Sequence, residues 1–207
     1  MKTKVAGFAL MGILAMMVIP GDLDYSQNEL IFYGAATMVQ KDALGQEIFS
    51  QTIHNRIVDS GEDFLLHATF EDSGFSDVAN NQQIGSICIS DAASPVVAET
   101  ETASDFDGDN GITENNCEED NTVTTTNATG LAVIGAITFT CGGDNCADDD
   151  TITAIGICQN SANSAGPLLN CAPRGSLFAI VDVTDTQLGA SETVDITYTF
   201  DISSAGT

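Results

Sequence analysis

The chain has 207 residues, of which 43% are hydrophobic, and its 30 acidic residues against 5 basic ones give a formal net charge of -25. This length fits one domain with an N-terminal extension and is enough to bury a sizeable core. A surface this acidic repels phosphate backbones, which argues against nucleic acid as a partner, whereas it attracts divalent cations and suits solubility in salt water.

The N-terminus has the pattern of an export signal. Lys2 and Lys4 precede an uncharged run of 15 residues, 5–19, which Pro20 then breaks. The run is shorter than the roughly 20 apolar residues that a membrane-spanning helix needs. Residues 1–21 are therefore predicted to be a secretory signal peptide, with an uncleaved N-terminal anchor as the alternative and the only expected membrane attachment. The protein is expected to be secreted or to lie at the cell surface.

Residues 22–50 are predicted to form an N-terminal strand arm. The apolar stretch 30–39 (LIFYGAATMV) is typical of a strand, and a turn at 40–45 leads to a second strand at 47–53, which together indicate a hairpin. The arm could add to the sheet of a neighbouring copy, because strand addition uses backbone hydrogen bonds. The alternative is that it pairs within its own domain. The residues expected to carry self-assembly are Leu30, Ile31, Phe32, Tyr33, Met38 and Val39.

Residues 51–207 are predicted to form a mainly β domain with one short helix. Apolar residues at helical spacing follow Asp59 and Ser60, either of which could cap the helix, and Gly74 ends the pattern. Strands are expected at 84–90, 122–126, 131–140, 151–158, 176–183 and 192–203, the last with clean two-residue alternation. The predicted fold is an antiparallel β-sandwich of jelly-roll or immunoglobulin-like type.

The six cysteines, an even number, fit disulfides in an exported chain and allow 15 pairings. The spacing of Cys141 and Cys146 would close a tight loop between strands. Cys158 and Cys171 flank a loop rich in Ser, Asn, Gly and Pro, which leaves one more pair. The predicted local pairing is Cys141 with Cys146, Cys158 with Cys171, and Cys88 with Cys117. Zinc is the alternative, but there is only one close cysteine pair and both histidines lie far from it.

The acidic insertion 91–121 contains a candidate calcium loop. Three aspartates alternate where an EF-hand places ligands 1, 3 and 5, but the glycine comes one residue late, and Asn116 stands where the bidentate Glu belongs. A looser calcium site therefore stays the hypothesis, with a solvated acidic loop tied down by Cys117 as the alternative. Its ligands would be Asp105, Asp107, Asp109 and Glu114.

Several stretches together resemble tail-associated β proteins of phages and prophages: TIHNRIVDSGEDFLLHATF, QIGSICISD, GAITFTCGG, TITAIGIC, GSLFAIVDV and LGASETVDITYTFDIS. They are also similar to secreted acidic proteins of marine ammonia-oxidising archaea. The resemblance covers residues 52–203, rests on strands and small residues, and implies a structural role without catalytic residues. The signal-like N-terminus, the six cysteines and the acidic insertion depart from the phage pattern and favour an exported surface or filament protein.

The motifs of common enzymes are missing from the sequence. There is no G-x-S-x-G, no phosphate-binding G-x-x-x-x-G-K, and His54 and His67 lie far in sequence from the cysteines. Asn127 begins an N-glycosylation sequon, Asn-Ala-Thr, which would mark an exposed loop. We therefore expect no enzyme.

The expected function is that of a structural subunit of an extracellular assembly, a filament, sheath or surface layer built from identical copies. The alternatives are a calcium-dependent surface adhesin or binding module, and a virion or tail component. Calcium is the one cofactor considered, and no other is expected.

Overall fold

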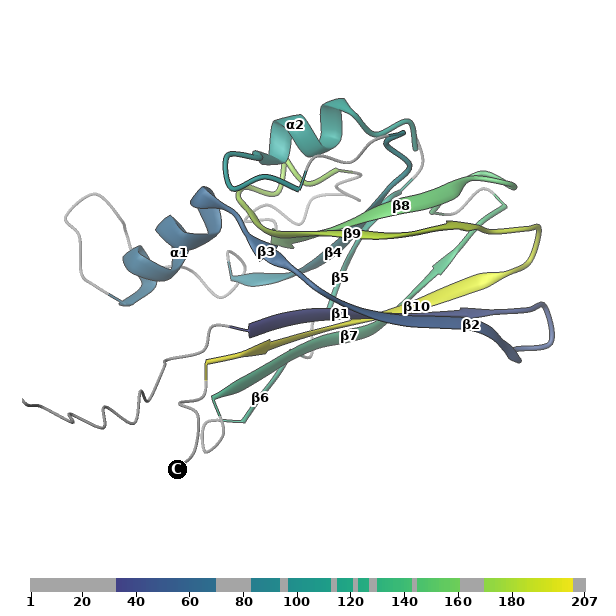
Figure 1. Ribbon diagram of the computed structural model, residues 1–207, viewed down its shortest axis with the longest axis horizontal. Coiled ribbons are helices and arrows are strands. Elements are labelled where there is room, and N and C mark those ends of the chain that lie inside the picture. Colours follow the sequence, from purple (N-terminus) through teal and green to yellow (C-terminus); the bar gives the residue numbers. More distant parts are fainter. Residues whose placement is uncertain are drawn as a thin grey trace, which may run out of the picture.

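The computed structural model describes residues 33–69, 83–93, 97–112, 115–120, 123–126, 130–142, 145–160 and 170–202. Within these residues the chain is mainly β, and two antiparallel five-stranded sheets pack face to face as a sandwich (Figure 1). This confirms the predicted antiparallel β-sandwich, whereas its jelly-roll or immunoglobulin-like type stays a prediction. The N-terminal sheet contains β2 (Glu47–His54), β1 (Tyr33–Lys41), β10 (Thr193–Asp201), β7 (Leu131–Thr140) and β6 (Thr124–Thr126), in that order. The disulfide sheet contains β3 (Arg56–Ile57), β9 (Leu177–Gln187), β8 (Thr151–Gln159), β4 (Ile84–Ser90) and β5 (Cys117–Glu119).

The N-terminal sheet is buried on one face. In β10, Val194, Ile196 and Tyr198 are buried, and the residues between them are half-buried. This is the alternation that the sequence predicted, and it arises because successive side chains of a strand point to opposite faces. The inward side chains pack against the disulfide sheet and form the main core of the sandwich.

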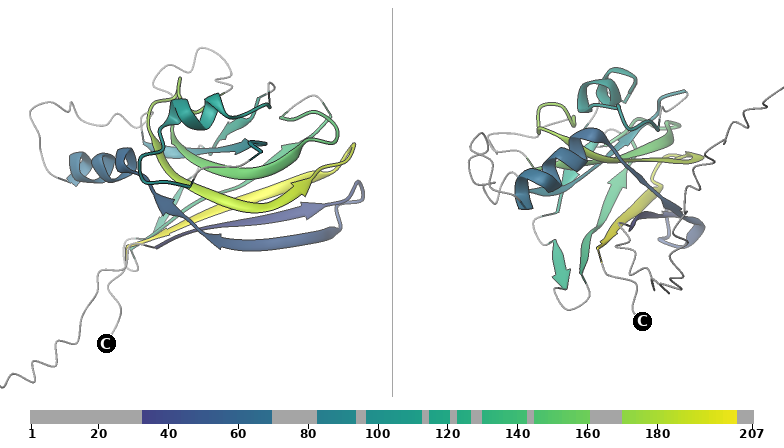
Figure 2. Two further views of the ribbon diagram at one scale, coloured as in Figure 1. Left: turned by 45° about the horizontal axis from the view of Figure 1, so that its top comes forward. Right: turned by 60° about the vertical axis from the view of Figure 1, so that its left-hand side comes forward.

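The disulfide sheet is buried on both faces. Seven consecutive residues of β8 are buried, and so are the last six residues of β4. One face packs against the N-terminal sheet, and the other lies under α2 (Ala103–Gly108) and the loop around Cys171 (Figure 2). These strands therefore stand in the sequence as unbroken apolar runs, which is the pattern of a strand with two covered faces.

The predicted hairpin is part of the sandwich in this structure. β1 pairs antiparallel with β2, and the turn between them is held by Asp42, whose carboxylate accepts the backbone N–H groups of Leu44 and Gln46. The other edge of β1 pairs along its whole length with β10, from Tyr33–Asp201 onward. In the described part of the expected arm, β1 is thus an inner strand of the N-terminal sheet and the start of β2 lies at its edge.

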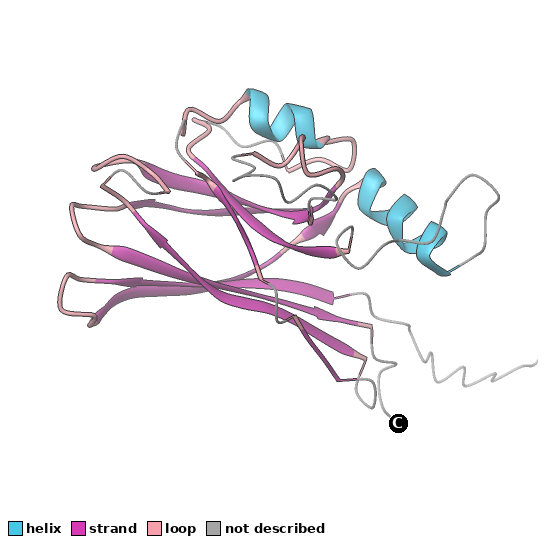
Figure 3. Ribbon diagram, turned by 180° about the vertical axis from the view of Figure 1, so that it is seen from behind, coloured by secondary structure: helices cyan, strands magenta, loops and turns pink. Residues whose placement is uncertain are grey.

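Both helices lie on the disulfide-sheet side of the sandwich (Figure 3). α1 (Asp59–Thr69) was expected, and it packs beside β9. α2 was not expected, because its six residues fall in the insertion that the sequence analysis treated as a loop. The described part of the chain therefore holds a second short helix beyond the one that was predicted. None of the helices in this part is long and apolar enough to cross a membrane.

Candidate functional site

α2 begins at a complete capping box. The hydroxyl of Thr102 accepts the backbone N–H of Asp105, and the Asp105 carboxylate accepts the backbone N–H of Thr102. This reciprocal pair satisfies two backbone donors that a helix start otherwise leaves free. On the opposite side of the helix, Phe106 is buried and packs over Gly156 of β8, where a Cβ atom would come within 2.9 Å of its ring. A short polar segment therefore folds as a helix because its start is capped and its aromatic residue is anchored.

The aspartates of the candidate calcium loop do not converge in this structure. Asp105 belongs to the capping box, whereas Asp107 accepts the backbone N–H groups of Cys171 and Ala172. Asp109 is exposed and follows the helix as its C-cap. Asp105 and Asp109 are four residues apart and share one side of the helix, whereas Asp107 lies on the other side, so the three carboxylates do not face one ion together as they would in an EF-hand loop. The fourth expected ligand, Glu114, lies outside the described residues.

The three disulfides have the predicted local pairing. Cys88 joins Cys117, Cys141 joins Cys146, and Cys158 joins Cys171. The sulfurs of Cys88, Cys158 and Cys171 lie close enough together to suggest a metal site, but each is part of a disulfide and therefore offers no thiolate. Three disulfides in one small domain indicate that the chain folds in an oxidising environment.

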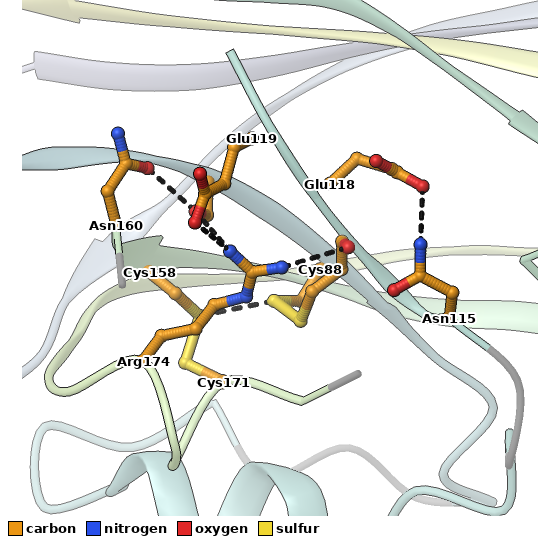
Figure 4. Close-up of polar contacts among 10 residues, drawn as sticks. Cys88, Asn115, Glu118, Glu119, Cys158, Asn160, Cys171 and Arg174 are labelled. Carbon is orange, nitrogen blue, oxygen red and sulfur yellow. Dashed lines mark hydrogen bonds and ion pairs between the residues drawn. A yellow bond between two sulfur atoms is a disulfide. The ribbon is translucent and has the colours of Figure 1, made fainter. Parts of the chain in front are cut away.

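Two of these disulfides lie side by side next to a buried arginine (Figure 4). The Sγ atoms of Cys88 and Cys158 are 3.4 Å apart. Arg174 is 7% exposed, and its guanidinium donates to Glu119 at 2.6 Å, to the Ser86 hydroxyl at 3.1 Å and to the backbone carbonyl of Cys117 at 3.1 Å. Arg174 therefore holds β4 and β5 to the loop after the Cys158–Cys171 disulfide.

Burial lowers the pKa of Arg174, and the Glu119 carboxylate beside it acts in the opposite direction. An arginine keeps its charge at all physiological pH values even so. The guanidinium is thus a permanent buried cation paired with the Glu119 carboxylate, with Glu118 and Asp107 also nearby, and its contacts with Ser86 and with a backbone carbonyl are those of a structural clamp. Sequence reasoning counted Arg174 among the few basic residues without giving it a role. Its position three residues after Cys171 in a very acidic chain was the available signal.

A second feature that the sequence analysis missed is Glu101, which precedes α2. It is 9% exposed and lines a small hollow of about 10 Å³ together with Ser90, Phe106 and Asp109. Burial raises the pKa of Glu101, and the carboxylates of Asp105 and Asp109 raise it further. No hydrogen bond to its carboxylate is found within the described residues. The ionised form of Glu101 is therefore destabilised by burial and by the two neighbouring carboxylates.

A second hollow is apolar and is lined by residues of both sheets. Its volume is about 150 Å³, and it is closed on one side by Phe64 and Leu65 of α1. Side chains of both sheets line the rest, among them Ile84, Ala132, Ile134, Phe178 and Phe200. Phe178 and Phe200 meet edge to face across the sandwich, with ring centroids 5.3 Å apart. We call this hollow the end cavity, because Phe200 pairs with Gly34 at the start of β1.

The residues expected to carry self-assembly divide into two groups. Met38 is fully buried in the core, and Val39 is half-buried on β1. Tyr33 is the first residue of β1 and pairs with Asp201. Leu30, Ile31 and Phe32 lie outside the described residues, as does the sequon residue Asn127. The second half of the expected set is therefore used inside the chain's own sheet in this structure.

The described residues offer no free thiol for nucleophilic chemistry. All six cysteines are paired, and His54 is an exposed residue at the end of β2. Apart from the three disulfide sulfurs, the described His, Cys, Asp and Glu side chains include no group of three with ligand atoms close enough for a metal ion. The described part of the chain is a disulfide-bonded β-sandwich with an apolar end cavity.

No protein-family model, curated protein or solved structure matches the chain. The resemblance to phage tail proteins and to secreted archaeal proteins therefore stays a prediction.

Proposed function

We propose that the protein is a structural subunit of an extracellular assembly, such as a filament, sheath or surface layer, and that it has no catalytic activity. Three disulfides and a permanent buried clamp at Arg174 support a fold that withstands conditions outside the cell. The acidic surface, with a net charge of -25, keeps single copies soluble, so attraction between them has to come from a local apolar contact.

The observation that carries this proposal is the end cavity. It opens at the end of the sandwich where β1 begins, and the residues before β1, at 30–32, read Leu-Ile-Phe. In sequence, an uncharged apolar segment thus directly precedes the strand that starts beside the apolar acceptor. Insertion of this segment into the cavity of another copy gives a closed dimer where it is mutual, and a ring or an open filament where it is repeated in one direction.

A site for a small polar ligand would look different. Such sites combine apolar walls with a few polar groups that orient the ligand. The residues that line the end cavity have aliphatic and aromatic side chains, and the hydroxyl of one of them, Tyr198, accepts a hydrogen bond from Asn55 at 3.0 Å. An apolar side chain from another protein copy suits this lining better than a polar metabolite does.

The test is imaging of the purified exported protein. We expect wild-type protein to form regular filaments or sheets in negative-stain electron microscopy, and a variant lacking residues 22–32 to stay monomeric in analytical ultracentrifugation. A deletion of the final residues 203–207 serves as the control, because it also removes a terminal segment but leaves the apolar residues in place. Wild-type protein that stays monomeric at all concentrations and calcium levels would sink the proposal.

A calcium-dependent adhesin or surface binding module is the second candidate, and Glu101 is the observation that favours it. A cation near Glu101 and Asp109 would relieve the repulsion that raises the pKa of Glu101. We expect calcium to raise the melting temperature of wild-type protein under this candidate, and the Glu101→Gln variant to lose the effect. An unchanged melting temperature at millimolar calcium rejects it.

A further inference from the structure

We propose that the two adjacent disulfides form one thiol–disulfide exchange site. A low-molecular-mass thiol from solution takes Cys171, and the disulfide bond at Cys88 then moves from Cys117 to Cys158. In this exchange Cys158 is the attacking sulfur, Cys88 is the sulfur attacked and Cys117 is the leaving group. The inference concerns the covalent chemistry of the domain and does not depend on the proposed assembly.

The attacking and the attacked sulfur are in contact in the folded domain (Figure 4). The Sγ atoms of Cys88 and Cys158 are 3.4 Å apart, and together with Cys171 the three sulfurs lie within 4.8 Å of one another. Reacting atoms held about 3–3.5 Å apart are in near-attack range. Cys88 and Cys158 lie on the neighbouring strands β4 and β8, where they pair with Gly156 and Ser86. The sheet therefore keeps the two sulfurs together when one disulfide is open.

Cys171 is the sulfur that a thiol from solution reaches most easily. It is buried, but it lies in the loop before β9, in which Pro173 and Gly175 are exposed. Cys88 and Cys158 lie within paired strands instead. A loop opens locally at a lower free energy than a core strand does. Brief opening of this loop thus exposes Cys171 while the sheet stays folded, and attack on Cys171 releases the sulfur of Cys158.

The exchange consists of two displacements in which atoms and electrons balance. In the first, the thiolate of the small molecule bonds to the Sγ of Cys171, and the Cys158–Cys171 bond breaks with its electron pair on Cys158. In the second, the Cys158 thiolate bonds to the Sγ of Cys88, and the Cys88–Cys117 bond breaks with its electron pair on Cys117. Cys117 then takes a proton from water. The number of sulfur–sulfur bonds is unchanged, so these steps need no oxidant or further reductant.

The exchange moves a covalent link within the disulfide sheet. Cys88–Cys117 joins β4 to the edge strand β5, whereas Cys88–Cys158 would join β4 to β8. After the exchange, β5 is held by its pairing with β4 and by Arg174, which donates to Glu119 and to the backbone carbonyl of Cys117. The domain thus keeps a cross-link in its central strands after the loop disulfide is lost, and it gains a thiol on an edge strand.

The Cys171→Ala variant tests the second displacement by itself, because it leaves Cys158 as a free thiol without any reductant. The folded variant is held at neutral pH, trapped with N-ethylmaleimide and mapped by mass spectrometry of linked peptides. We expect the Cys88–Cys158 link to appear and the Cys88–Cys117 link to fall by the same amount. A variant in which every molecule keeps Cys88–Cys117 and carries an alkylated Cys158 would overturn the proposal.

Cys146→Ala is the matched control. It also frees one buried cysteine, Cys141, whose sulfur does not belong to the group of three close sulfurs. We expect the other two disulfides to keep their pairing in this control, and thermal melting shows that both variants are folded. Links from Cys158 to Cys141 or Cys146 in Cys171→Ala would show general scrambling of disulfides, and they would contradict a specific site.

Limited reduction of wild-type protein with dithiothreitol tests the whole sequence of steps and does not require any variant to fold. The informative molecules keep the disulfide at Cys141 and carry two alkylated cysteines. We expect the alkylated residues to be Cys117 and Cys171 and the new link to join Cys88 to Cys158. Any other pair of alkylated cysteines in these molecules would overturn the exchange.

Discussion

The Asp107 carboxylate receives the backbone N–H of Cys171 at 2.9 Å, and the next N–H in the chain, that of Ala172, at 2.7 Å. One side chain of α2 thus fixes the loop that the Cys158–Cys171 disulfide ties to β8. Two parallel N–H donors require two acceptor oxygens, which a carboxylate provides and an amide does not. Asp107 was expected to be a calcium ligand, and the contacts it makes are those of a structural acceptor.

Asp107→Asn is expected to destabilise the fold. The amide NH2 would face one of the two backbone N–H groups, leaving a half-buried donor unsatisfied at a cost of about 1–3 kcal/mol. Urea unfolding measures the change. Asp109→Asn is the matched control, since Asp109 is exposed, and it should lie within about 0.5 kcal/mol of wild type. Equal effects of the two substitutions would show that Asp107 does not hold the loop.

Removing the charge of Arg174 is expected to destabilise the fold more than Asp107→Asn does. Arg174→Met leaves the Glu119 carboxylate, the Ser86 hydroxyl and a backbone carbonyl without their donor. Breaking a buried ion pair on one side costs about 3–5 kcal/mol, and partial exposure of Glu119 places the loss at the lower end of this range. The double variant with Glu119→Gln should recover part of this loss, because it also removes the negative charge that Arg174 balances. Chemical denaturation of both variants measures their free energies of unfolding.

The disulfides should contribute differently to the stability of the fold, according to the length of the loop that each closes. Cys88–Cys117 spans 29 residues and Cys141–Cys146 only 5. The chain-entropy relation gives about 3.5 kcal/mol for the first loop and about 2 kcal/mol for the second. Because all four cysteines are at most 2% exposed, paired alanine variants leave comparable cavities, and their difference reflects the loops. A larger loss for the short loop, measured by guanidinium unfolding, would contradict this expectation.

Glu101 should make the fold less stable as the pH rises. Its pKa in the folded protein is raised, so that the folded state binds the proton more tightly than the unfolded chain does. The stability that this group contributes is fully present below its unfolded pKa of about 4.3 and is lost as the pH rises through the folded value. Glu101→Gln stays neutral at every pH. We therefore expect it to melt above wild type at pH 7 and the gap to close near pH 4. If the difference in melting temperature between Glu101→Gln and wild type is the same at both pH values, the buried carboxylate is not its cause.

The strands were predictable because each covered face leaves a pattern in the sequence. The period of two in β10 and the unbroken apolar run in β8 both indicated strands, and their burial in the structure follows the same patterns. β5 was missed, since its three residues, Cys-Glu-Glu, carry no apolar pattern, and it is held by Arg174 and the disulfide at Cys117.

The candidate sites were harder to predict because they depend on distant contacts. α2 is stabilised by Phe106 over Gly156, which lie far apart in sequence. Glu101 is buried by the helix that follows it, and an acidic stretch by itself does not tell which carboxylate is covered. The end cavity requires residues of α1 and of several strands to meet at one place. The local disulfide pairing was predictable, by contrast, because chain spacing and loop composition limit which cysteines can meet.

The pairing of β1 with β10 has a consequence for the order in which the chain folds. The first strand of the sandwich needs the last one as its neighbour, so the N-terminal sheet cannot close until residues near Asp201 have been synthesised and released. Until then, β1 and β2 form an isolated hairpin, which is marginally stable in water. A chain that is threaded through a membrane from its N-terminus would therefore remain unfolded in this half for the whole transit, and it would close its sheet only on the far side.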